Sequence, residues 1–106
     1  MKQTAEYLSV AVRAAKAAGA IIRAAQGGPL QVRHKGTIDL VTQVDEACEA
    51  EIRAILEKDT PGVAILAEES GGAWGADTRW LVDPLDGTTN FVHGYPSYGV
   101  SIGLEI

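Results

Sequence analysis

The 106-residue sequence predicts an α+β fold in which two N-terminal helices pack on a largely antiparallel sheet. Two helical patterns come first, over residues 3–26 and 42–58. Short apolar stretches follow, and the last, from Tyr98 to Ile106, alternates between apolar residues and small or polar ones. Because helices and strands do not alternate along the chain, a doubly wound sheet is disfavoured. We expect residues 1–106 to belong to one domain, since no linker or repeat interrupts them.

The first helix is predicted from apolar residues that recur at steps of three and four. The members of this stripe are Ala5, Leu8, Val12, Ala15, Gly19 and Ile22. Several are small, so we expect another element to pack closely against the stripe. The sequence Gly27-Gly28-Pro29 is typical of a helix end.

The second helix is predicted to begin after Thr42, which with Asp45 forms a capping-box-like pair. It should end near Lys58, because Pro61-Gly62 cannot continue it. Cys48 falls on its apolar face and is expected in the core. The segment before this helix, 31–42, is expected to be extended chain with a turn at residues 35–36.

Two short strands are predicted in the middle of the chain. The sequence VAIL, 63–66, is the first, and a glycine-rich surface loop, 70–78, follows it. The second, RWLV, is expected to stop at Asp83, because Pro84 has no N–H with which to continue a ladder. Residues 87–96 should form a turn with about one helical turn.

Bulk composition excludes several classes of protein. Hydrophobic residues make up 46% and charged residues 22%, which suits a folded core. A net charge of −5 without a basic patch argues against a nucleic-acid partner. The single cysteine excludes an internal disulfide, and no signal peptide or membrane-spanning run is evident. The cytoplasm is the expected compartment.

Two aspartates that follow the second strand, Asp83 and Asp86, need a physical reason. Carboxylates about 4 Å apart repel by roughly 4 kcal/mol at an effective dielectric near 20. Protonation relieves one carboxylate, whereas a hard divalent cation suits several at once. Glu68 and Glu69 end the neighbouring strand and could join the pair, and the carbonyl of Leu85 lies between the aspartates in sequence. These oxygen ligands suit Mg²⁺.

The residues after the aspartates suit a phosphate. Gly87 permits close approach of the backbone to a ligand, and Thr88 adds a hydroxyl and an N–H.

The stretch WLVDPLDGTTNFVHGYP resembles the signature of the inositol monophosphatase family, Trp-x-x-Asp-Pro-x-Asp-Gly-Thr-x-x-Phe. Two upstream stretches fit in order and spacing. KGTIDLVTQVD resembles the family's Lys-x-x-x-Asp-Leu-Val-Thr-x-x-Asp segment, and ILAEES resembles its Gly-Glu-Glu-Ser segment, with Ala67 in place of glycine. The bacterial inositol-1-monophosphatase type is the most similar.

This resemblance implies the first part of an αβαβα sugar-phosphatase fold and a set of Mg²⁺ ligands. Glu68, Asp83 and the carbonyl of Leu85 would hold a first ion. Asp83 and Asp86 would hold a second, and Glu68 with waters a third. Glu69 is then a surface acid.

The resemblance also implies roles in catalysis and substrate binding. Asp45 and Thr88, with Glu68 at the metals, would orient and deprotonate the attacking water. The backbone of Gly87 and Thr88 would hold the phosphate, with Glu68 and Asp86 also contacting substrate. Lys35 would lie on a loop that closes over the site.

The implied reaction is Mg²⁺-dependent hydrolysis of inositol 1-phosphate to inositol and phosphate, inhibited by Li⁺, in a cytoplasmic homodimer. Family members are more than twice as long, and a further aspartate ligand lies in their later half. The chain therefore resembles an N-terminal part, and we expect it to be inactive alone. Other sugar or nucleotide phosphates stay open as substrates. A binding or regulatory role with a transcription-associated protein partner also stays open.

Other interpretations of the acidic motif fit less well. A calcium loop with Gly87 at its invariant position would begin at Val82 and end at His93, neither of which suits a ligand position. A haloacid-dehalogenase-type phosphatase needs two aspartates two apart, and Pro84 occupies the nucleophile position. Asp45 could be a capping residue alone.

Overall fold

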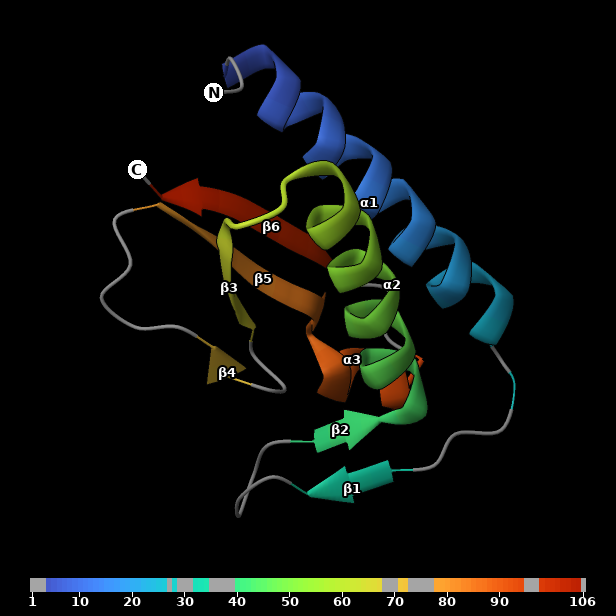
Figure 1. Ribbon diagram of the computed structural model, residues 1–106. Coiled ribbons are helices and arrows are strands. Elements are labelled where there is room, and N and C mark those ends of the chain that lie inside the picture. The colour runs from blue at the N-terminus through green and yellow to red at the C-terminus, as the bar shows by residue number, and fades with distance from the viewer. Residues whose placement is uncertain are drawn as a thin grey trace.

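The computed structural model describes residues 4–26, 28, 32–34, 40–67, 71–72, 78–94 and 98–105. Two long helices, α1 (Thr4–Ala25) and α2 (Gln43–Asp59), pack on one face of a four-stranded sheet (Figure 1). The sheet has the order β4-β3-β5-β6, and β1 and β2 form a separate antiparallel pair. The remaining elements are β1 (Val32–His34), β2 (Leu40–Thr42), β3 (Ala64–Ala67), β4 (Gly71–Gly72), β5 (Arg79–Asp86), α3 (Thr88–Val92) and β6 (Gly99–Glu105). The α+β prediction is confirmed.

The sheet is mixed. β4 pairs with β3 and β6 pairs with β5 in antiparallel orientation, as predicted, but β3 and β5 run parallel. The predicted glycine-rich loop is partly wrong, because Gly71 and Gly72 pair with the end of β3. Within the described part of the chain, no helix is both long and apolar enough to cross a bilayer.

The buried face of α1 differs from the predicted stripe. Val10, Ala14, Ala18 and Ile22 are buried, whereas Leu8 is 64% exposed and Val12 is 43% exposed. Alanines occur on nearly every side of this helix, so the apolar period alone did not identify its packed side. The close contact expected for small residues does occur, since the Cys48 thiol of α2 lies 3.5 Å from the Ala18 carbonyl oxygen.

The start of α2 agrees with the sequence. Thr42 is the N-cap, and its side chain accepts hydrogen bonds from the Val44 and Asp45 backbone N–H groups. The Thr42 N–H donates in return to the Asp45 carboxylate at 2.7 Å, which completes the capping box. The Arg13 guanidinium of α1 contacts Asp59 at the other end of α2, at 2.6 Å.

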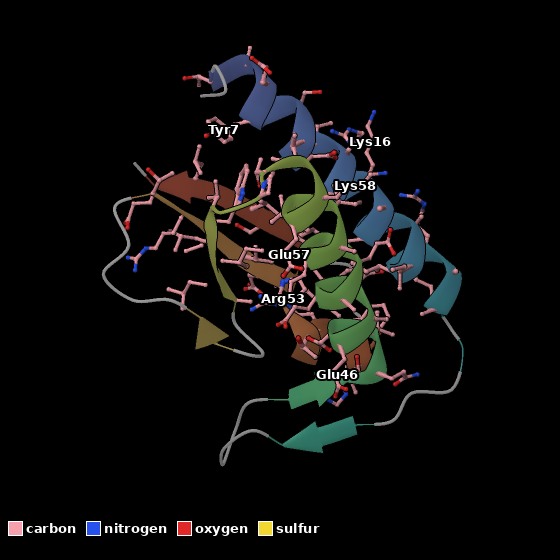
Figure 2. All side chains as sticks on the ribbon, viewed as in Figure 1. Tyr7, Lys16, Glu46, Arg53, Glu57 and Lys58 are labelled. Atoms are coloured by element: carbon pink, nitrogen blue, oxygen red, sulfur yellow. The ribbon has the colours of Figure 1, made fainter. Side chains whose placement is uncertain are left out.

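Among the described residues, Trp80 on β5 is the largest fully buried side chain. Its indole N–H donates to the Thr60 hydroxyl at 3.0 Å, and that hydroxyl donates to the Leu56 carbonyl at 2.5 Å. The Tyr7 ring of α1, labelled in Figure 2, meets the indole edge-on with ring centres 6.0 Å apart. Thus the polar atom of this large side chain is satisfied at the end of α2.

The prediction that the second strand stops at Asp83 is wrong, because β5 continues through Pro84 to Asp86. Asp83 pairs with Ser101 and Asp86 pairs with Gly99. The chain therefore advances three residues on β5 where it advances only two on β6. This irregularity is a β-bulge, which accommodates an extra residue outside regular ladder pairing. Pro84 lies inside the bulge, where its missing N–H is tolerated.

Candidate functional site

Asp45 and Thr88, two of the predicted site residues, come together where β5 ends and α3 begins, close to the start of α2. Figure 1 shows how these elements are arranged. The chain enters α2 directly from β2 and enters α3 one residue after β5. Segments that are 43 residues apart in sequence are therefore brought together at this point.

The β-bulge places Asp83 and Asp86 on one face of the sheet. Residues three apart in a regular strand point to opposite faces. Here their cross-strand partners, Ser101 and Gly99, are two apart and so share a face, and each aspartate shares the face of its partner. Asp83 is half-buried and Asp86 is exposed. The two aspartates therefore lie on the same face of the sheet because of a bulge, where the sequence had predicted a turn.

The residues that follow form a tight junction. Gly87 has φ 85°, a left-handed conformation that favours glycine. Its carbonyl accepts a hydrogen bond from the Phe91 N–H at 3.0 Å and so begins α3. The Thr88 hydroxyl lies 3.0 Å from the carbonyl oxygen of Leu85, the carbonyl predicted as a metal ligand.

Asp45 and Thr88 are in direct contact. The Thr88 hydroxyl oxygen lies 2.7 Å from Asp45 Oδ2, while the Thr42 N–H and hydroxyl lie 2.7 Å and 2.6 Å from Asp45 Oδ1. A hydroxyl has one proton and two lone pairs, and a carboxylate is a stronger acceptor than a carbonyl. Thr88 therefore donates to Asp45 and keeps lone-pair capacity toward a water.

The two oxygens of the Asp45 side chain are engaged on different sides. It is 0% exposed, and its two oxygens face different partners. Oδ1 closes the capping box of α2, and Oδ2 faces the junction at Thr88. Capping and a role at the site are therefore compatible in one residue.

The pKa of Cys48, which lies one turn after Val44 on α2, depends in part on the buried Asp45. Burial, and secondly the negative charge of Asp45, raise the pKa of the Cys48 thiol from 9.0 to about 11. The thiol is therefore neutral and inert at ordinary pH, which agrees with its predicted role in the core.

Glu68, Glu69 and Lys35 lie outside the described residues. Among those described, no three acidic, histidine or cysteine side chains gather as a metal site. The donors present are nevertheless oxygens only, namely the carboxylates of Asp83 and Asp86 and the Leu85 carbonyl. A hard cation such as Mg²⁺ fits this donor set.

Sequence reasoning missed a second buried acid, Glu49, which is 8% exposed. Its Oε2 accepts from Arg53 Nε at 3.3 Å, while Oε1 has no partner among the described residues. Figure 2 shows Arg53 and Glu57 along α2, on the side of the helix away from α1. The i, i+4 spacing of Glu49 and Arg53 was the available signal, but it does not reveal burial.

Comparison with known proteins gives consistent matches. The model of the inositol monophosphatase family matches residues 3–106. "Inositol monophosphatase 1" of Solanum lycopersicum is 50% identical over 106 residues, which cover 95% of this chain and 39% of that protein. "Nus factor SuhB" of Pasteurella multocida is 44% identical over 105 residues, covering 93% of this chain and 39% of that protein.

A solved structure shows the same arrangement. The extragenic suppressor protein SuhB of Bartonella henselae matches with a TM-score of 0.87 and 43% identity, covering 93% of this chain and 40% of that one. The chain thus spans about two fifths of the length of the relatives it matches.

Proposed function

The chain belongs to the inositol monophosphatase family, and we propose that it supplies the metal-binding part of a phosphatase that hydrolyses phosphate monoesters of a polyol. The contact between Asp45 and Thr88 beside the Asp83–Asp86 pair is the observation that carries this proposal. It puts a proton acceptor, a hydroxyl and two carboxylates at one junction of the fold.

We assign the proton steps to Asp45 and Thr88. A water that donates a hydrogen bond to the Thr88 hydroxyl oxygen is positioned by it, and the Thr88 proton is directed at Asp45 Oδ2, 2.7 Å away. The backbone N–H of Thr42 holds Asp45 in the required orientation. The water attacks phosphorus directly, and no phosphorylated residue forms.

Mg²⁺ is the proposed cofactor, held by Asp83, Asp86 and the Leu85 carbonyl together with Glu68. When bound, Mg²⁺ stabilises the charge that develops on the nucleophile, the phosphoryl group and the leaving oxygen. The Gly87 and Thr88 backbone N–H groups are assigned to the phosphate, and Lys35 to a loop over the site. Asp86 and Glu68 are assigned to substrate contact as well.

Inositol 1-phosphate is the proposed substrate, and Li⁺ is the proposed inhibitor, acting at Asp83 and Asp86. The proposed setting is a cytoplasmic homodimer of the complete protein. Identities of 46–50% to relatives that carry the inositol monophosphatase or inositol-1-monophosphatase name support the substrate proposal. The cytoplasm is consistent with a lone, buried and reduced Cys48.

The test uses the complete natural reading frame that encodes these residues. Asp86→Asn removes an anionic ligand, so Mg²⁺-dependent release of phosphate from inositol 1-phosphate should fall at least about a hundredfold with the melting temperature maintained. Asp59→Asn makes the same chemical change at the far end of α2 and should leave the rate unchanged. A near-normal rate for Asp86→Asn at saturating Mg²⁺ would refute the assignment.

A second candidate role is protein binding, favoured by the similarity to proteins named Nus factor SuhB. We propose a transcription-associated protein partner for this role. Two results together would favour protein binding over catalysis. The complete protein would co-purify with a transcription protein in a stoichiometric amount, and the complete protein would show no phosphatase activity. Recovery of an active enzyme without such a partner would count against it.

A further inference from the structure

The helix α3 carries the Thr88 hydroxyl and is only five residues long. So short a helix is not stable alone, because its few hydrogen bonds do not offset the cost of nucleation. Contacts with other elements must therefore hold α3 in place. Among the described side chains of α3, Phe91 alone is buried, with 6% of its surface exposed. Phe91 is thus the residue that anchors α3 to the rest of the fold.

The ring that meets Phe91 belongs to Tyr98, which lies directly before β6. The two rings meet edge-on, with centres 5.1 Å apart and an interplanar angle of 83°, which is a favoured arrangement of an aromatic pair. The Tyr98 hydroxyl accepts a hydrogen bond from the side-chain amide of Gln26, the residue directly after α1. Tyr98 is therefore held by Gln26 at its hydroxyl and contacts α3 with its ring.

The contact at Phe91 leads to the site through the first turn of α3. The Phe91 N–H donates to the Gly87 carbonyl at 3.0 Å, and Thr88 lies within that turn. The Thr88 hydroxyl lies 2.7 Å from Asp45 Oδ2. A shift of α3 by about half an ångström away from α2 would take this contact beyond the range of about 2.5–3.0 Å for such bonds. The placement of α3 by Phe91 therefore determines whether the contact between Thr88 and Asp45 forms.

We propose that Tyr98 is a positioning residue for the proton transfer assigned to Asp45 and Thr88, and that it acts through Phe91. Gln26 holds the Tyr98 hydroxyl and so contributes from the end of α1. The proposal rests on the proposed phosphatase function and adds to it two residues that are assigned no contact with phosphate, metal or attacking water.

The test compares Tyr98→Leu with Tyr7→Leu in the complete protein. Tyr7, labelled in Figure 2, is a matched control, because its ring also meets a buried ring edge-on, that of Trp80, with centres 6.0 Å apart. Trp80 is bonded to Thr60 at the end of α2, whereas Asp45 lies at the start of α2. Both variants lose an aromatic pair, and only one of these pairs contacts α3.

Tyr98→Leu should lower kcat for inositol 1-phosphate by about tenfold or more and leave KM nearly unchanged, because the reacting groups are misplaced while the substrate still binds. Tyr7→Leu should leave both constants nearly unchanged. Equal values of kcat in the two variants would overturn the proposal. A rise in KM without a fall in kcat in Tyr98→Leu would overturn it too, because Tyr98 would then contact substrate.

A double-mutant cycle tests whether Tyr98 acts through Thr88. Once Thr88→Ala has removed the hydroxyl, its position no longer matters, and adding Tyr98→Leu should lower kcat no further. If the two substitutions lower kcat by factors that multiply in the double variant, the path through Thr88 is wrong.

The contribution of Gln26 is tested by removing one hydrogen bond from either side. Tyr98→Phe and Gln26→Met each remove the bond between these side chains and retain the ring contact with Phe91. They should lower kcat by the same factor, smaller than that of Tyr98→Leu, and the double variant should be no slower than either. A larger loss in the double variant would overturn the assignment of Gln26.

Hydrogen exchange at the Phe91 amide separates this proposal from the proposed function. It reports the bond to the Gly87 carbonyl whether or not the protein is active. Tyr98→Leu should speed this exchange by about threefold or more, and Tyr7→Leu should not. If the unmodified protein hydrolyses no phosphate ester, the phosphatase function fails, and the proposal fails with it. If the protein is active and the exchange is unchanged in Tyr98→Leu, the positioning proposal alone is overturned.

Discussion

Replacing Asp45 by asparagine separates its capping role from its proposed catalytic role. Asparagine has nearly the same shape, and its carbonyl oxygen can accept the Thr42 N–H and hydroxyl bonds that Oδ1 accepts now. Its NH₂ group would then face the Thr88 hydroxyl, which now donates to Asp45 Oδ2. Thr88 can turn its proton to the Leu85 carbonyl, 3.0 Å away, and accept from the asparagine instead. No buried group is left unsatisfied by the exchange.

The two roles predict losses of different size. A hydrogen bond to a charged group contributes about 1.5–3 kcal/mol and a neutral one about 0.5–1.5 kcal/mol. Part of the difference is offset because a neutral side chain costs less to bury. We therefore expect Asp45→Asn to lower the free energy of unfolding by about 1–2 kcal/mol. Loss of a general base lowers the rate by about 10²–10⁴-fold, which that change in stability does not explain.

The assay measures urea unfolding and phosphate release in the complete protein, with Thr42→Ala as the control. Thr42→Ala removes the capping side chain, at a cost of about 1 kcal/mol, but retains the contact between Asp45 and Thr88. It should keep most of the activity. If Asp45→Asn is as active as Thr42→Ala at equal stability, Asp45 is a capping residue and the proton path through Thr88 is wrong.

Three further predictions concern stability and association. Because folding raises the pKa of Cys48 from 9.0 to about 11, the folded state retains a proton that the unfolded state loses, and the free energy of unfolding should fall by about 2 kcal/mol between pH 9 and 11. In Cys48→Ala, the free energy of unfolding measured by urea titration should not show this decrease between pH 9 and 11. Thr60→Val leaves the Trp80 N–H buried without its hydrogen-bond partner and should lower the free energy of unfolding by about 1–3 kcal/mol. Tryptophan fluorescence during urea unfolding measures this loss. The 106-residue chain alone should self-associate and show no turnover. Val12→Lys, beside β6, should reduce that association in sedimentation, whereas Leu81→Lys should not.

Local signals in the sequence predicted the elements that local chemistry determines. Thr42 and Asp45 predicted the start of α2, because a capping box depends on residues three apart. The alternation from Tyr98 predicted β6, since one apolar face of a strand is visible in the sequence alone. The motif residues likewise predicted that Asp45 and Thr88 belong to one site, and the structure brings them into contact.

Features that depend on a partner element were missed. The buried side of α1 is chosen by α2, through close contacts such as that of Cys48 with Ala18, and an alanine-rich helix does not specify it. The parallel pairing of β3 with β5 depends on how the chain returns between them.

Asp83 and Asp86 are three residues apart, and the bulge between them allows both to lie on one face of the sheet. An interval of two would achieve this in a regular strand, but it would leave no bulged residue between them. The bulge inserts that residue, and Leu85 is buried while its carbonyl faces the Thr88 hydroxyl. Two carboxylates and a backbone oxygen are thereby supplied by four consecutive residues. Because Pro84 lies within the bulge and Gly87 ends it with positive φ, the backbone that holds these oxygens is constrained on both sides. Rigid oxygen donors of this kind suit a cation better than flexible side chains alone, since less conformational freedom is lost on binding.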